Sequence, residues 1–337
     1  MPLHLKTAPT KTFADTAQQD VAERVRGIIG DIRENGDVAV RRYAEQFDDW
    51  SRDSYRLSDE EITEIIGTLD AQVITDIEFV QSQVRRFAQA QRDSLVDIEV
   101  ETLPGVFLGQ KHVPVQAAGA YIPGGKYPLT ASAHMTIITA KVAGVPRVVA
   151  CTPPIRGEIP AATVAAMKMA GADEIYILGG VQAVAAMAVG TDSIEPVNMI
   201  AGPGNAYVAE AKRQLFGEVG IDLFAGPTEI LIVADEHADP FFTAVDLLSQ
   251  AEHGPDSPAV LVTTSQALAE EVMDWIEKIL PGMPTRDYAG PAWRDWGQVI
   301  VADDLDEAYR IADDFAFEHV QIFTPVSYTH LTLPTKA

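Results

Sequence analysis

From about residue 117 to residue 324, short apolar segments alternate with longer stretches whose apolar residues recur at helical spacing. Segments such as "RVVACT", "EIYIL", "ILIVA" and "AVLVT" are typical of strands, and a helical pattern follows each. Short apolar strands alternating with amphipathic helices indicate parallel sheets with helices on both faces. The units are too many for one sheet, so the sequence predicts an α/β protein with two domains.

The segment before this alternation is predicted to be mostly helical. Helical periodicity runs through residues 18–47, with a break at "ENGD" (34–37). Ser58 and Glu61 form a capping-box pattern ahead of a further helix, and another helix follows at about 70–93. The later predicted helices are 130–143, 159–170, 181–189, 206–216, 240–253, 266–279 and 305–316.

Composition limits the classes of partner. The net charge is −24, from 25 basic and 49 acidic residues, and such a surface repels nucleic acids and anionic membranes. No apolar run reaches the length of a membrane helix, and the first twenty residues lack the apolar core of a secretory signal. Cys151 is the single cysteine, which fits a reducing compartment, so we expect a cytoplasmic protein.

Four glycine-rich turns follow predicted strands: "YIPGGKYP", "LGGVQA", "AGPGNAY" and "AGPTE". Glycine lets a backbone approach a phosphate closely, and a following helix N-terminus favours negative charge. No glycine stands five residues before Gly125, and Tyr127 follows Lys126, so the sequence excludes a P-loop. A Rossmann-like nucleotide site of non-standard form and ordinary strand–helix turns both remain open.

Two polar pairs are candidates for catalysis. Gln250 and His253 lie three residues apart at the end of a predicted helix and therefore share a face, where they could hold zinc or only cap the helix. Glu318 and His319 stand where a helix leads into a strand. They could be a general base and a partner carboxylate, or an exposed loop pair.

Taken together, the ordered blocks resemble the histidinol dehydrogenase family. The blocks are "GAYIPGGKYPL", "GGVQAVAAMAVGT", "AGPGNAYVAEAKRQLFG", "DLFAGPTEILIVAD", "DLLSQAEHGPDSPAVL" and "EHVQIFT", and the resemblance covers about residues 15–324. It implies a zinc- and NAD-dependent enzyme that oxidises a primary alcohol through an aldehyde to a carboxylate, reducing two NAD. The family substrate is L-histidinol, which becomes L-histidine in histidine biosynthesis.

The resemblance also implies roles for particular residues. It makes Gln250 and His253 zinc ligands that also contact the substrate, and Thr228 a substrate contact. Glu318 and His319 become the catalytic pair. The implied NAD contacts are Tyr121, Gln182 and Asn205, each in or beside one of the glycine-rich turns.

The implied fold is two Rossmann-like parallel-sheet domains, the second inserted in the first, after a helical N-terminal segment. The domains are expected at 21–119 plus 227–325 and at 120–226, with an arm at 1–20. The resemblance further implies a homodimer whose active sites borrow residues from the partner chain.

The substrate is open between two alcohols. His134 stands where enzymes of histidine biosynthesis tend to have an aliphatic residue, and "GQKHVPV" and "GGKYPL" are closer to the sulfopropanediol 3-dehydrogenase branch. That branch oxidises 2,3-dihydroxypropane-1-sulfonate to sulfolactate, and a protonated His134 would suit the sulfonate. His134 could equally only pack beside the second domain.

The last twelve residues, 326–337, do not resemble the family. "VSYTHLTLPT" is interpreted as translated sequencing adapter on a truncated gene, so Tyr328, His330 and Lys336 receive no role. Relatives continue with an Asp and a His that complete the zinc shell. The chain as written is therefore expected to bind zinc weakly and to turn over little. A non-catalytic nucleotide-binding protein is the alternative if the truncation is genuine.

Overall fold

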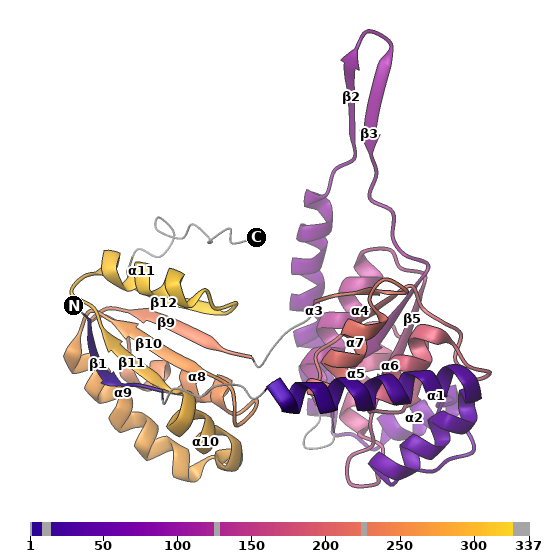
Figure 1. The fold of residues 1–337 in the computed structure, drawn as a ribbon, viewed down its shortest axis with the longest axis horizontal. Helices are drawn as coiled ribbons and strands as arrows, with labels where there is room; N and C mark the ends of the chain where they lie inside the picture. The colour runs from indigo at the N-terminus through magenta and orange to yellow at the C-terminus, as the bar shows by residue number, and fades with distance from the viewer. Residues whose placement is uncertain (1, 9–14, 125–128, 224–227, 326–337) are drawn as a thin grey trace. The chain divides into compact units, whose positions relative to one another are not determined.

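The chain forms two compact units in the computed structural model, which describes residues 2–8, 15–124, 129–223 and 228–325. Unit 1 combines Met1–Phe13 with Gly226–Ala337, and unit 2 is Ala14–Ala225. Each has its own sheet (Figure 1). Each also has its own apolar core. The predicted α/β class and the two parallel-sheet domains are therefore confirmed.

Unit 2 is built on a five-stranded parallel sheet in the order β6-β5-β4-β7-β8. Its strands are β4 (Ala117–Tyr121), β5 (Arg147–Thr152), β6 (Glu174–Ile177), β7 (Met199–Ala201) and β8 (Gly220–Ile221). In the register, Ala120 of β4 lies opposite Ala150 on one side and Ala201 on the other. This order is that of a Rossmann half, in which the first strand is central and the chain winds outward from it in both directions.

Helices cover both faces of this sheet because its central strands are buried on both sides. Val149 and Cys151 of β5 belong to one apolar cluster, and Val148 and Ala150 belong to the other. The first face carries α1 (Asp15–Asp48), α6 (Gly180–Val189) and α7 (Ala206–Leu215). The second carries α2 (Asp59–Gly67), α3 (Ala71–Ser94), α4 (Thr130–Val142) and α5 (Ala161–Ala170).

Two of the local sequence signals are observed in unit 2. The break predicted at "ENGD" is a kink within α1, where Gly36 has φ 50° and ψ −130°. Ser58 and Glu61 form the reciprocal capping box at the start of α2, with bonds of 3.1 and 2.8 Å. Both signals depend only on neighbouring residues, which is why the sequence was sufficient to predict them.

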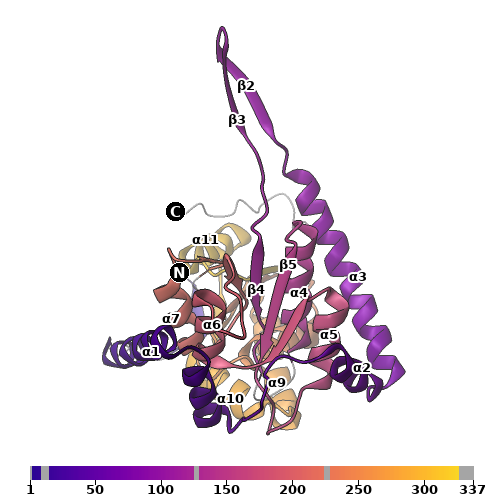
Figure 2. The ribbon, with the colours of Figure 1, turned by 90° about the vertical axis from the view of Figure 1, so that its right-hand side faces the viewer.

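A two-stranded hairpin extends away from the rest of unit 2 (Figures 1 and 2). It consists of β2 (Ile98–Leu103) and β3 (Val106–Gln110), and every one of its residues is exposed. One side of the ladder carries Ile98, Val100 and Leu108, because Val100 pairs with Leu108.

Unit 1 has a second five-stranded sheet, in the order β1-β11-β10-β9-β12. Strands β9 (Ile230–Ala234), β10 (Ala259–Thr263), β11 (Gln298–Val301) and β12 (Val320–Phe323) are parallel, and β1 (Leu3–Lys6) joins the edge antiparallel to β11. One face packs on α8 (Pro240–Ala251), α9 (Gln266–Ile279) and α10 (Arg286–Trp296), which follows a short 3₁₀ turn, Leu280–Gly282. The other face packs on α11 (Leu305–Phe315).

The division of the chain differs from the predicted one. Residues 21–119 were expected to join 227–325, but they belong to unit 2, and the expected boundary at 119–120 falls inside β4. The boundary near residue 226 is observed. The reason is packing: Val25 of α1 shares a cluster with Met187 of α6, and Ile77 of α3 shares one with Ile137 of α4. Within the expected arm, Leu3–Lys6 form β1 at the edge of the unit 1 sheet.

Residues 326–337 lie outside the described part of the chain, so their interpretation as translated adapter stays a prediction. Among the described residues, no helix combines the length and hydropathy that crossing a bilayer requires.

Candidate functional site

The topological switch point of the unit 2 sheet lies at its carboxyl edge, between β4 and β7. The chain leaves neighbouring strands β4 and β7 for opposite sides of the sheet, and ligands of open α/β sheets bind in the resulting crevice. Three of the glycine-rich turns, those after β4, β6 and β7, begin at this edge, as predicted. Residues 125–128 of the first turn are outside the described part of the chain.

Close backbone approaches shape this edge. A Cβ atom on Gly202 would lie 2.0 Å from the carbonyl oxygen of Tyr121, and one on Gly179 would lie 2.5 Å from Cβ of Pro153. At both positions a side chain would collide with the segment that follows or ends the neighbouring strand. Glycine is therefore required by this close approach as well as by the geometry of its own turn.

Tyr121 ends β4 and is 4% exposed. Its hydroxyl oxygen accepts a hydrogen bond from the backbone N–H of Gly180, the first residue of α6, at 3.0 Å. Burial raises the pKa of the Tyr121 phenol, so the group is neutral where it meets the helix N-terminus. Tyr121, a predicted contact of the nucleotide, is therefore hydrogen-bonded to the turn that follows β6.

Gln182 lies in the first turn of α6 and is 1% exposed. Its amide nitrogen Nε2 donates to Oδ2 of Asp48, the last residue of α1, at 2.9 Å. Its carbonyl oxygen Oε1 is buried and has no hydrogen-bond partner among the described residues. Burial raises the pKa of Asp48, and the bond from Gln182 opposes that shift. Sequence analysis missed Asp48, because no local pattern marks it.

Asn205 is the N-cap of α7. Its Oδ1 accepts from the backbone N–H groups of Tyr207 at 3.0 Å and Val208 at 3.1 Å. The Asn205 side chain is exposed, so its amide nitrogen can still donate hydrogen bonds to a ligand. Tyr121, Gln182 and Asn205 therefore gather at one edge of one sheet, on the three turns where they were predicted.

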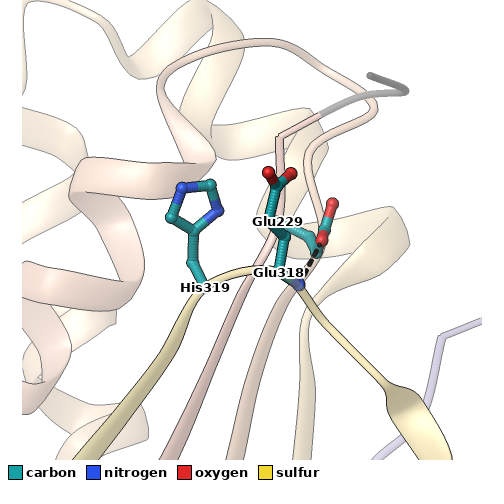
Figure 3. A group of neighbouring side chains, drawn as sticks. All are labelled: Glu229, Glu318 and His319. Carbon is teal, nitrogen blue, oxygen red and sulfur yellow. Dashed lines mark hydrogen bonds between the residues drawn. The ribbon is translucent and has the colours of Figure 1, made fainter. Parts of the chain in front are cut away.

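A second cluster of polar side chains lies in unit 1, at the amino ends of neighbouring strands. Glu229 directly precedes β9, and Glu318 and His319 directly precede β12. Ligand atoms of the three side chains lie within 4.8 Å of one another, and the backbone N–H of Glu318 donates to Oε1 of Glu229 at 2.9 Å (Figure 3). This is the edge opposite to the one that the general rule for α/β sheets favours.

Glu229 was missed by the sequence analysis. The signal was available, since Glu229 stands before its strand as Glu318 and His319 stand before theirs. Using it required knowing that β9 and β12 are parallel neighbours. Thr228, the predicted substrate contact, immediately precedes Glu229 and is half-buried at the same strand end.

Gln250 and His253 lie at the end of α8, and their environment fits a metal site. Nδ1 of His253 lies 3.0 Å from the carbonyl oxygen of Ser249. A carbonyl can only accept, so Nδ1 carries the proton and Nε2 keeps its lone pair for a ligand. Nε2 of Gln250 is buried without a partner among the described residues, and the two ends of a glutamine amide are nearly interchangeable in position. The amide can therefore turn to present its carbonyl oxygen, which is the atom of an amide that suits zinc.

The packing of α8 places these residues on the His319 side of the sheet. Asp246, one turn before Gln250, interacts with the side chain of Gln321, which lies two residues after His319. Residues i and i+4 share a helix face, and residues i and i+2 share a strand face. Because α8 runs back towards the amino ends of the strands, Gln250 is the next position along α8 towards His319.

His134 does not lie at either cluster. It is 3% exposed within α4, its Nδ1 is 3.1 Å from Nε2 of Gln81, and Gln81 also donates to the carbonyl oxygen of Ala166 at 2.9 Å. Burial lowers the pKa of the imidazole and so disfavours the protonated form. The predicted contact with a sulfonate is wrong for this arrangement. The burial of His134 against Gln81 agrees with the alternative, a role in packing alone.

The fold and the two clusters are those of an α/β enzyme built from two Rossmann-like units. A sequence model of the histidinol dehydrogenase family matches residues 12–335, so the match includes most of residues 326–337, which were expected not to resemble the family. The chain therefore belongs to the histidinol dehydrogenase family, whose members are oxidoreductases.

Individual relatives agree with this assignment. The chain is 58% identical over 324 residues to a "Histidinol dehydrogenase homolog" of Shouchella clausii, covering 96% of this chain and 76% of that protein. It is 46% identical to a "Sulfopropanediol 3-dehydrogenase" of Ruegeria pomeroyi, covering 95% of this chain and 73% of that protein. The crystal structure of histidinol dehydrogenase from Elizabethkingia anophelis matches with a TM-score of 0.87 at 33% identity, over 96% of this chain and 74% of that one.

Proposed function

We propose that the intact gene product oxidises a primary alcohol through an aldehyde to a carboxylate, with NAD as the electron acceptor and zinc at the substrate. The observation that carries the proposal is the cluster of His319, Glu318 and Glu229 beside the end of α8. An imidazole next to carboxylates at an exposed strand end can take and return protons near neutral pH.

His319 is proposed to accept the alcohol proton in the first oxidation. In the second, His319 or Glu318 activates the water that adds to the aldehyde and makes its hydrate. Glu229 holds the backbone of Glu318 and so fixes the direction in which that residue points. Thr228 offers a hydroxyl at the same strand end for the substrate. The intermediate aldehyde stays bound between the two steps.

Gln250 and His253 are proposed to hold zinc. When bound there, zinc would polarise the substrate oxygen. Tyr121, Gln182 and Asn205 are proposed to hold NAD, and two NAD molecules bound in turn would each accept one hydride. The buried, unpartnered Oε1 of Gln182 supports a ligand at this edge, since buried polar atoms without a partner are rare.

The test is the formation of NADH from L-histidinol by the intact gene product as wild type and as His319→Asn and Glu318→Gln. We expect both variants to lose roughly 100-fold or more in kcat. His237→Asn is the matched control, because His237 is an exposed histidine of unit 1 at the opposite end of β9. Full activity in His319→Asn would overturn the assignment. NAD binding without any turnover in the wild type would favour the non-catalytic alternative.

Two alcohols should be assayed in parallel. L-histidinol is the leading substrate, and 2,3-dihydroxypropane-1-sulfonate is the second, favoured by the 46% identity to the sulfopropanediol dehydrogenase. The burial of His134 removes the earlier argument for the sulfonate. The alcohol with the higher kcat/KM is the substrate, and failure on both would indicate a third.

We also propose a homodimer in the cytoplasm. Light scattering coupled to size-exclusion chromatography tests the dimer directly, since a monomer mass of 36.4 kDa would contradict it.

A further inference from the structure

We infer that Asp48 is a positioning residue of the nucleotide site, which acts by fixing the orientation of the Gln182 amide. The inference rests on the proposed function, in which unit 2 binds NAD. It concerns a residue 134 positions away from Gln182 in the sequence.

The hydrogen bond between Gln182 and Asp48 can run in only one direction, from the amide to the carboxylate. An ionised carboxylate has acceptors and no donor, so the group of Gln182 that faces Asp48 must be the NH₂ group. Oxygen and nitrogen of a glutamine amide are otherwise nearly interchangeable in position. Asp48 therefore decides which end of the amide faces away from it, and that end is the carbonyl oxygen.

The carbonyl oxygen is placed where a ligand can use it. Oε1 of Gln182 is buried and unpartnered among the described residues, and it lies 2.8 Å from the position that a Cβ on Gly180 would take. Gly180, with φ +63°, leaves that space open at the start of α6. The same glycine donates its N–H to Tyr121, so the oxygen lies beside the switch point.

This orientation selects the chemistry of the ligand. A carbonyl oxygen accepts hydrogen bonds, so the group that meets it must be a donor, such as a hydroxyl of ribose or the NH₂ of a carboxamide. A phosphate has only acceptors near neutral pH and would be repelled, the more so with the Asp48 carboxylate behind the amide. The phosphates of a dinucleotide therefore belong to other positions at this edge.

The test measures the dissociation constant for NAD by calorimetry in five chains: wild type, Asp48→Ala, Asp48→Asn, Gln182→Met and the double variant Asp48→Ala/Gln182→Met. Asp48→Ala removes the acceptor, and we expect it to weaken NAD binding roughly 10-fold. Asp48→Asn keeps an acceptor oxygen, so it should stay within about 3-fold of the wild type. Because Asp48 acts through Gln182, Asp48→Ala should have no further effect in the Gln182→Met background.

Asp49→Asn is the matched control. It removes a negative charge one residue after Asp48, from a side chain that is exposed. The backbone of Asp49 has a φ of 48°, which asparagine also adopts readily. We expect its affinity for NAD to equal that of the wild type. Inorganic pyrophosphate, used as a competitor of NAD, should bind the wild type and Asp48→Ala equally.

Several outcomes would overturn the inference. Equal weakening by Asp48→Ala and Asp48→Asn would mean that the charge itself acts on the ligand. Additive effects of Asp48→Ala and Gln182→Met would show that Asp48 does not act through the amide. Weaker pyrophosphate binding in Asp48→Ala would put the phosphates at Gln182. If the wild type binds no NAD, the proposed cofactor site fails as well, whereas normal NAD binding by Asp48→Ala removes this inference alone.

Discussion

At the scale of single residues, Gly202 shows how closely the turns of the nucleotide edge approach one another. Its Cα packs against the backbone of Tyr121, where any side chain would overlap the Tyr121 carbonyl. Its φ of +128° lies in a region that residues with a side chain rarely adopt. Two separate physical constraints therefore require glycine at this position.

Gly202→Ala should destabilise unit 2 strongly. We expect a loss of about 3 kcal/mol or more in the free energy of unfolding, because both the strain and the overlap act. Gly217→Ala is the control, since Gly217 also has a positive φ, +101°, but has nothing within 4 Å of the added carbon. The control should lose only about 1 kcal/mol. Urea unfolding measures both, and equal losses would contradict the argument from overlap.

Asp48 gives a prediction on pH. Burial raises its pKa, so the folded chain binds this proton more tightly than the unfolded chain. The stabilisation from the protonated form is present below the ordinary pKa of aspartate and is lost as the pH rises through the raised pKa.

Asp48→Asn should therefore gain stability relative to the wild type as the pH rises through that window, and the difference should stay constant above it. Unfolding by urea at a series of pH values measures the difference. A difference between the two chains that does not change with pH would contradict the prediction.

At the scale of elements, the hairpin β2–β3 stands apart from every other strand. Both of its faces are exposed, and a lone two-stranded hairpin is marginally stable in water. Strands β4 and β5 carry comparable ladders but are buried on both sides.

Amide hydrogen exchange should separate these elements. We expect the amides of β2 and β3 to exchange much faster than those of β4 and β5, since local opening of the hairpin exposes little buried surface. Mass spectrometry of peptic peptides makes the comparison within one sample. Slow exchange in the hairpin at low protein concentration would show that something covers it.

At the scale of the whole molecule, the N-terminal strand ties the two ends of the sequence to one sheet. Leu3 and His4 pair with Val301 and Ile300, and Nζ of Lys6 donates to the carbonyl oxygen of Gly297 at 2.7 Å. The segment between β1 and β9 folds as unit 2, with its own cores. The chain therefore enters unit 1, leaves it for unit 2, and returns.

Deletion of residues 1–8 should weaken unit 1 and leave unit 2 unchanged. Loss of the edge strand exposes β11, and we expect unit 1 to lose about 2 kcal/mol. Hydrogen exchange should quicken in β11 and β10, while β4 and β5 keep the rates of the full chain. Faster exchange in β4 and β5 would contradict the division into two units.

The sequence by itself determined what depends on neighbouring residues and on recurrent motifs. The alternation of strands and helices, the capping box at Ser58, the interruption at residues 34–37 and the family were all predicted from it. The turns that carry Tyr121, Gln182 and Asn205 were also placed correctly, because a glycine-rich turn after a strand fixes its own position at the sheet edge.

The tertiary structure alone decided how distant segments meet. Periodicity shows that a helix has an apolar face but not which sheet that face covers, so α1 to α3 were assigned to the wrong domain. Three hydrogen-bond contacts likewise join residues far apart in the chain. They are those of His134 with Gln81, of Gln182 with Asp48 and of Glu229 with Glu318. Such contacts depend on strand order and helix packing, which no local pattern contains.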